Sequence, residues 1–233
     1  MLIDMHSHTS GISRCSKINY KDLIDLNKSF GIDGIILCNH YEKGYVVDGD
    51  VDAFANKYIK EYYDMARYGK EVGYKVFFGI EVTLAKYNNA HLLIYGVEPE
   101  FLLSFPDIFD YDLEYIREIV KDRDAYLIQA HMLRVNNPKL DPRLLDGIEF
   151  NCHFKKNGPQ VEEIIRIAKE ENFIITCGGD FHNDTPRNKC GIICPDNITD
   201  TLDLLNYINR NRTNTYLIHE TPSDEPYEIK VTI

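Results

Sequence analysis

Histidine and carboxylate side chains recur in this sequence around short apolar runs that are typical of β-strands. The candidates are His6, His8, His40, Glu81, His91, His131, Asp180 and His182. Any one of these histidines alone would be better explained as a structural residue. Their shared position at strand ends instead predicts side chains that converge, and mixed imidazole and carboxylate ligands suit zinc, iron or manganese.

Two pairs of candidates are separated by a single residue, His6 with His8 and Asp180 with His182. Residues i and i+2 of a strand point to the same side, so each pair can place two side chains on one ion. A carboxylate such as Glu81 can also bridge two ions, which an imidazole does not readily do. A centre of two or three ions suits phosphoester hydrolysis, because the ions polarise a phosphoryl oxygen and activate a water for attack at phosphorus.

Strand-like and helical segments that would position these side chains alternate along the chain. Strand-like runs cover residues 1–6, 32–38, 75–83, 91–97, 125–131, 147–152, 173–177, 190–194, 215–220 and 227–233. Helical patterns cover residues 20–30, 51–72, 111–121, 159–171 and 200–211. The run at 91–97 follows a turn signal, Asn88-Asn89, and is expected to form a hairpin with the run before it. The alternation otherwise predicts a mostly parallel sheet.

One closed or nearly closed α/β barrel, a single domain over residues 1–233, is the expected architecture. No linker, internal repeat or low-complexity tract divides the chain, and hydrophobic residues make up 44% of it, enough for a substantial core. In βα barrels the catalytic groups lie at the C-terminal ends of the strands. The candidate ligands occupy those ends in the predicted order of elements.

The composition limits the classes of binding partner and the cellular compartment that we expect. The net charge is −11 and no basic block occurs, so an extended nucleic-acid surface is not expected. A small phosphorylated substrate is compatible with this charge, because bound cations dominate the field in their own neighbourhood. No apolar run approaches the ~20 residues of a membrane-spanning helix, and the N-terminus lacks the pattern of a signal peptide. We therefore expect a cytoplasmic protein without a membrane partner.

The motifs together resemble those of the PHP (polymerase and histidinol phosphatase) family of metal-dependent phosphoesterases. DMHSHTS resembles the first motif of that family, H-x-H-T/S, and ILCNH resembles the second. GIEVT holds the matching Glu81, and the later segments HLLIYG, IQAH and GGDFH resemble the remaining motifs. The resemblance spans nearly the whole chain. It implies a distorted (β/α)7 barrel with the metal site at the C-terminal ends of the strands.

The resemblance also implies a role for each candidate ligand. Two or three ions would be held by His6, His8, Glu81 and Asp180, by Glu81, His91 and His131, and by His40 and His182. Of these residues, His40, Asp180 and His182 are also the expected catalytic residues. The chain departs from the family pattern at two places. Asn39 replaces the usual Asp before His40, which predicts weaker orientation of that imidazole. Arg14 or Cys15 occupies the loop where the family commonly supplies a further ligand.

Three arginines are candidates for binding the phosphate of the substrate: Arg14, Arg134 and Arg187. A guanidinium group suits this role because it pairs with phosphate through two parallel N–H donors. Together these features imply hydrolysis of a small phosphorylated metabolite or a short nucleotide. Two alternatives stay open: a metal-bearing PHP module without turnover, and an amidohydrolase-like enzyme that cleaves C–N bonds. Amidohydrolases often bridge their metals with a modified lysine, whereas here Glu81 is expected to form the bridge.

Overall fold

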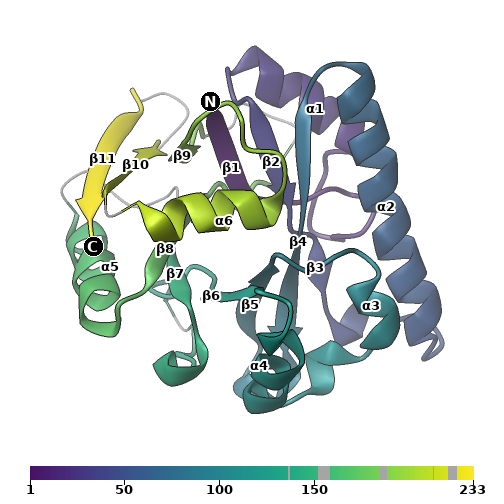
Figure 1. The fold of residues 1–233 in the computed structure, drawn as a ribbon. Coiled ribbons are helices and arrows are strands. Elements are labelled where there is room, and N and C mark those ends of the chain that lie inside the picture. Colours follow the sequence, from purple (N-terminus) through teal and green to yellow (C-terminus); the bar gives the residue numbers. More distant parts are fainter. Residues whose placement is uncertain (136, 152–157, 184–187, 212, 220–224) are drawn as a thin grey trace.

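One curled sheet of eleven strands organises the fold (Figure 1). The structure is a computed structural model that describes the whole chain except residues 136, 152–157, 184–187, 212 and 220–224. The strands are β1 (Leu2–Ser7), β2 (Gly34–Leu37), β3 (His40–Tyr41), β4 (Lys75–Leu84), β5 (Ala90–Tyr95), β6 (Tyr126–Gln129), β7 (Gly147–Asn151), β8 (Ile174–Gly178), β9 (Gly191–Ile193), β10 (Thr213–Ile218) and β11 (Tyr227–Thr232). Their order is β11-β10-β9-β1-β2-β4-β5-β6-β7-β8, and β3 pairs with β4 outside this path.

Helices are interspersed with these strands, which confirms the predicted α/β class (Figure 1). They are α1 (Tyr20–Ser29), α2 (Val51–Glu71), α3 (Phe101–Ser104), α4 (Leu113–Lys121), α5 (Pro159–Glu171) and α6 (Thr201–Arg210). Side-chain caps fix several starts: Asn19, Asp50 and Asp200 each accept from backbone N–H groups of the first turn. None of the described helices is both long enough and apolar enough to cross a membrane.

The sheet is mixed, not mostly parallel as the alternation of elements suggested. β1, β2 and β4 are mutually parallel, as are β6, β7 and β8. Between these groups, β5 is antiparallel to both β4 and β6, because only a short turn connects β4 to β5 and reverses the chain. Asn88 and Asn89 of that turn have φ angles of 50° and 58°, so the predicted hairpin is confirmed.

The segment that follows β8 meets β1, so distant parts of the sheet come together. The backbone N–H of Asp180 donates to the carbonyl of His6 at 2.8 Å, and that of His8 donates to the carbonyl of Phe181 at 3.1 Å. Ser7 and Phe181 form an isolated parallel bridge. The two i, i+2 pairs of candidate ligands therefore lie side by side, although more than 170 residues separate them in sequence.

Gly178 is expected to be essential for this junction. A Cβ atom at the position would lie 2.2 Å from Cβ and 2.6 Å from the backbone nitrogen of His6. We predict that Gly178→Ala lowers the free energy of unfolding by about 3 kcal/mol, the upper part of the range for overpacked sites, because neither contact is the end of a flexible side chain. Urea denaturation followed by circular dichroism measures the change.

Gly44→Ala is the matched control. There the added methyl group would meet only the far end of the Glu42 side chain, at 3.4 Å. We expect the control to stay within about 0.5 kcal/mol of the wild type. Equal unfolding free energies for the two variants would show that the contact between Gly178 and His6 is not restrictive.

Candidate metal centre

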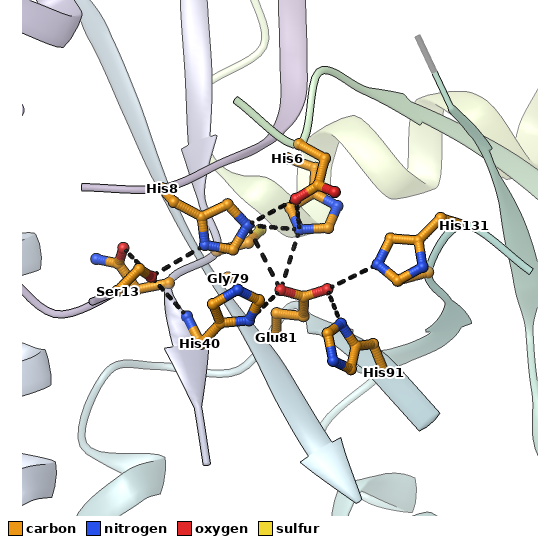
Figure 2. A network of polar contacts seen from close by, with 12 residues as sticks. His6, His8, Ser13, His40, Gly79, Glu81, His91 and His131 are labelled. Atoms are coloured by element: carbon orange, nitrogen blue, oxygen red, sulfur yellow. Dashed lines mark hydrogen bonds and ion pairs between the residues drawn. The ribbon is translucent and has the colours of Figure 1, made fainter. Parts of the chain in front are cut away.

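The carboxylate of Glu81 lies at the centre of a group of imidazoles (Figure 2). Glu81 is fully buried and lies within β4, not at its end as the sequence pattern suggested. Its Oε2 atom is 3.4 Å from Nε2 of His6, 3.4 Å from Nε2 of His8 and 2.6 Å from Nδ1 of His40. One carboxylate oxygen therefore faces three ring nitrogens.

The other carboxylate oxygen of Glu81 faces two further histidines. Oε1 is 2.8 Å from Nδ1 of His91 and 3.2 Å from Nε2 of His131 (Figure 2). His91 reaches the centre from the start of β5, since that strand is antiparallel to β4 and pairs His91 with Thr83. His40 comes from the two-residue strand β3, whose parallel register places it opposite Glu81.

Asp180 and His182 enter the centre from the segment after β8. Oδ1 of Asp180 is 3.1 Å from Nε2 of His8 and 3.7 Å from Nε2 of His6. The ring of His182 donates from Nδ1 to the backbone carbonyl of Asp180 at 2.7 Å. Its Nε2 atom then faces the centre, 3.4 Å from Nε2 of His40. The structure thus brings all the candidate ligands of the sequence into one connected group.

A chain of hydrogen bonds behind His8 sets the tautomer of this imidazole. The backbone N–H of Thr9 donates to Oδ1 of Asn39 at 2.7 Å, which fixes the orientation of the amide. The Ser13 hydroxyl donates to the same oxygen at 2.9 Å, so it accepts from Nδ1–H of His8, 3.0 Å away. Nε2 of His8 is left free to ligate. Asn39 therefore supports His8, and none of its described hydrogen bonds reaches the ring of His40, the residue it was expected to orient.

Glu149 in β7 is a functional candidate that the sequence analysis did not assign. It is fully buried, and its Oε1 accepts from Nδ1–H of His6 at 2.9 Å while Oε2 accepts from the backbone N–H of His131 at 3.0 Å. A lone charge in the apolar run GIEF was the available signal, because a buried charge requires partners. Asp4 supports the same region by accepting from the backbone N–H groups of His6 and Gly179, at 3.0 and 2.8 Å.

The charges in the centre shift the pKa values of its members. Burial by itself would raise the pKa of Glu81, but the neighbouring histidines, His40 above all, outweigh burial and hold this pKa well below its usual value. Burial likewise lowers the pKa of His40, and the Glu81 carboxylate reverses that effect and raises the pKa to about 10. Burial and the charge of His40 hold the pKa of His8 well below its usual value. The centre therefore holds negative charge that only protons or cations can balance.

Three sets of side chains fit a shared cation. The donor atoms of each set lie within 4.8 Å of one another, and the sets are His6, His8, Glu81 and Asp180, then His40, Glu81 and His91, then His8, His40 and His182. His131 contacts Glu81 without belonging to any of the three. Oε2 of Glu81 and Nδ1 of His40 are buried and lack a hydrogen-bond partner with suitable geometry among the described residues. A divalent cation would satisfy such orphaned atoms, and the donor types suit zinc, iron or manganese.

The three candidate arginines have different surroundings. One guanidinium nitrogen of Arg134 is 3.5 Å from Oδ2 of Asp180, and 58% of the Arg134 side chain is exposed, so the group lies on the solvent side of the centre. Arg14 donates to two backbone carbonyls of the 3₁₀ turn at residues 43–45 and stacks over an aromatic ring there. Its guanidinium therefore joins two loops. Arg187 lies outside the described residues.

Cys15 is the residue of the loop after His8 that borders the third set of ligands. Partial burial raises the pKa of its thiol, but hydrogen bonding with His182 and His40 outweighs burial and lowers this pKa to about 6. The side chain is exposed, so it borders the centre from the solvent side. The sequence placed two residues near a third ion. Cys15 lies beside the imidazoles of His40 and His182, whereas Arg14 donates to a neighbouring turn.

Comparison with known proteins finds similarity at the level of structure. No family model and no curated protein matches the chain. A two-domain protein from Bacteroides vulgatus that contains a predicted PHP-like metal-dependent phosphoesterase matches with a TM-score of 0.67 and 17% identity, over 94% of this chain and 65% of that one. PsfC from Pseudomonas syringae matches with a TM-score of 0.62 and 16% identity, over 95% and 92% of the two chains.

A third similar structure is a predicted metal-dependent phosphoesterase from Bifidobacterium adolescentis. It matches with a TM-score of 0.55 and 15% identity, over 88% of this chain and 94% of that one. The chain spans less than two thirds of the two-domain Bacteroides protein, and most of the other two structures. At these identities the likeness is one of fold.

The raised pKa of His40 predicts how the stability of the metal-free protein depends on pH. The charge on the ring pairs with Glu81 only in the folded state. Its contribution is complete below the pKa of an unfolded histidine, about 6.5. This contribution is lost as the pH rises through the pKa of His40 in the folded protein, about 10. We expect the melting temperature of chelated protein to fall across this interval, as followed by differential scanning calorimetry.

His40→Gln is the reference for this measurement, because glutamine has a similar size and no charge to lose. Other groups also titrate between neutral and alkaline pH, so the relevant quantity is the difference between the wild type and the variant. We expect that difference to shrink steadily as the pH rises. Parallel melting curves for the two chelated proteins at every pH would contradict the prediction.

Proposed function

We propose that this chain, which has the fold of PHP-like metal-dependent phosphoesterases, is itself a metal-dependent phosphoesterase acting on a small phosphorylated metabolite or a short nucleotide. The observation that carries the proposal is the convergence of imidazoles and Asp180 on the two oxygens of the buried Glu81. Of the structures with a similar fold, one contains a predicted PHP-like metal-dependent phosphoesterase and another is itself a predicted metal-dependent phosphoesterase, which supports the same chemistry here.

A distorted (β/α)7 barrel in a single domain, residues 1–233, is the architecture that we propose behind this centre. In support, the segment after β8, the last strand at one end of the sheet, returns to β1, so the curled sheet folds back on itself. The candidate ligands near β1, β2, β6 and β8 lie at or just beyond the C-terminal ends of those strands, where barrel enzymes carry their catalytic groups.

Two or three divalent ions, zinc, iron or manganese, are proposed to occupy the centre. Their ligands would be His6, His8, Glu81 and Asp180, then Glu81, His91 and His131, and, for a third ion, His40 and His182. The observed distances add His40 to the second set and His8 to the third. When bound, such ions polarise a phosphoryl oxygen and lower the pKa of a water molecule.

His40, Asp180 and His182 are proposed to act in catalysis. The His182 ring is oriented by the backbone carbonyl of Asp180, and 19% of its side chain is exposed, so its Nε2 lies between the centre and solvent. In a centre of two ions this nitrogen can give a proton to the leaving group of the substrate. In a centre of three ions it would be a ligand together with His40. The Asp180 carboxylate holds the rings of His6 and His8 from the other side.

Metal analysis combined with an assay on a phosphoester panel tests the proposal. We expect purified protein to contain divalent metal and to hydrolyse p-nitrophenyl phosphate or another member of the panel, with activity lost on chelation and restored by metal. Replacing a residue that only supports a metal ligand typically costs about 10–100-fold in activity. Glu81→Gln is expected to reduce kcat by more than this, because it removes the carboxylate that would bridge the ions. Glu228→Gln, an exposed position in β11, is the control and should retain full activity.

Other results of this assay would overturn the proposal. Metal-loaded protein that cleaves amides or other C–N bonds, and no phosphoester, would identify an amidohydrolase-like enzyme. Protein that binds metal tightly and turns over neither class of substrate would identify a binding module.

Arg134 is proposed to hold the phosphate group of the substrate. We expect Arg134→Ala to raise KM about 10- to 100-fold with a smaller change in kcat, since hydrogen bonds to charged groups contribute about 1.5–3 kcal/mol. Michaelis–Menten kinetics on the best substrate of the panel measures both constants. Arg143→Ala is the matched control, because Arg143 lies in the same β6–β7 connection as Arg134 and pairs with Asp141 at 2.6 Å. An unchanged KM for Arg134→Ala would exclude this role.

A further inference from the structure

Glu149 is a fully buried carboxylate whose two oxygens serve different ligand segments. Oε1 accepts from Nδ1–H of His6, on β1, at 2.9 Å. Oε2 accepts from the backbone N–H of His131, which follows β6, at 3.0 Å. His6 and His131 contact different oxygens of the Glu81 carboxylate (Figure 2). Glu149 therefore contacts two candidate ligands that reach Glu81 from different strands.

The contact with the His6 ring decides which of its nitrogens can ligate. An imidazole that donates from Nδ1 has an unprotonated Nε2 in its neutral form. Nε2 of His6 lies 3.0 Å from Nε2 of His8 and 3.4 Å from Oε2 of Glu81, inside the first set of ligands. The tautomer that Glu149 selects is thus the one that exposes a lone pair to the centre.

The contact with His131 restrains a backbone conformation that histidine rarely adopts. The φ angle of His131 is 32°, in the left-handed region, where a residue other than glycine costs about 1–3 kcal/mol. Glu149 accepts from the N–H of this residue, and the Asn137 side chain donates to its carbonyl at 3.1 Å. Both backbone groups of the strained residue are therefore held, and the ring reaches Oε1 of Glu81.

We propose that Glu149 is a positioning residue of the metal centre, which keeps His6 in the Nδ1–H tautomer and holds the strained backbone of His131. This inference rests on the proposed metal centre. It assigns to one buried carboxylate the orientation of two ligands that contact different oxygens of Glu81. A carboxylate is required at this position because it alone can accept from both donors at once.

Replacement by glutamine separates the two contacts. The amide has one oxygen, and the backbone N–H of His131 cannot change its role, so the oxygen is expected to pair with that group. The amide NH₂ then faces Nδ1 of His6, which becomes an acceptor only if the ring moves its hydrogen to Nε2. That nitrogen loses its free lone pair, and the first set of ligands loses one donor. Glutamine preserves the size of the side chain and its contact with the backbone N–H of His131.

Zinc titration of the chelated protein by isothermal calorimetry, with ¹⁵N NMR of the histidine rings, tests the proposal. We expect Glu149→Gln to weaken one zinc site about 10- to 100-fold, the usual effect of removing the partner of a ligating histidine. The site formed by Glu81 and His91 should keep its affinity. The neutral ring of His6, assigned from a His6→Gln variant, should show the hydrogen on Nδ1 in the wild type and on Nε2 in Glu149→Gln.

Asp4→Asn is the matched control, because it also removes one buried negative charge beside His6. Asp4 accepts from the backbone N–H groups of His6 and Gly179 and from the Ser7 hydroxyl. We expect Asp4→Asn to keep the His6 tautomer. A Glu149→Gln protein with wild-type zinc affinity and an unchanged tautomer would overturn the proposal. Equal losses of affinity in both variants would also overturn it, since they would indicate a charge effect alone.

These outcomes are independent of catalysis. If the wild type binds zinc but hydrolyses no phosphoester, the proposed function fails while the role of Glu149 stands on affinity and tautomer. If the wild type is an active phosphoesterase and Glu149→Gln binds zinc as the wild type does, only the role of Glu149 fails. Thermal unfolding of the chelated variants confirms that each is folded during the titration.

Discussion

A fully buried carboxylate, Glu81, is the constraint on which the rest of the centre depends. A charge removed from water is tolerated only when opposite charges or hydrogen-bond donors surround it. Five ring nitrogens within 3.4 Å provide that environment, and some of them must carry protons when no cation is present. The raised pKa of His40 and the lowered pKa of Glu81 are two expressions of the same balance. Cations that replace those protons would remove the repulsion between the rings.

The fold meets this constraint by bringing strands to one place from both directions. Parallel strands alone would deliver side chains only from their C-terminal ends. The hairpin between β4 and β5 adds His91 from the start of an antiparallel strand, and the short β3 sets His40 opposite Glu81. Gly178 allows the backbone after β8 to approach His6 closely enough for Asp180 to join. The mixed direction of the sheet therefore contributes directly to the composition of the centre.

A second layer of buried polar groups decides how the ligands present their lone pairs. Ser13 with Asn39 fixes His8, and Glu149 contacts His6 in the same way, through Nδ1. Both arrangements leave Nε2 directed at the shared space, where the two nitrogens are 3.0 Å apart. Two lone pairs at that distance repel each other unless a cation or a proton lies between them. The orientation of these rings is thus difficult to explain without a positively charged occupant.

The sequence by itself determined the candidate ligands and most of the strands and helices, with β3 and α3 as exceptions, because apolar periodicity and the positions of His and carboxylate residues are local properties. The α/β class and the hairpin at Asn88-Asn89 followed from the same local signals. Tertiary structure alone decided that Asn39 supports His8 and that Glu149 contacts two ligand segments. These relations depend on strand register and on contacts between residues more than a hundred positions apart, such as His6 and Glu149, and no local pattern encodes such distances.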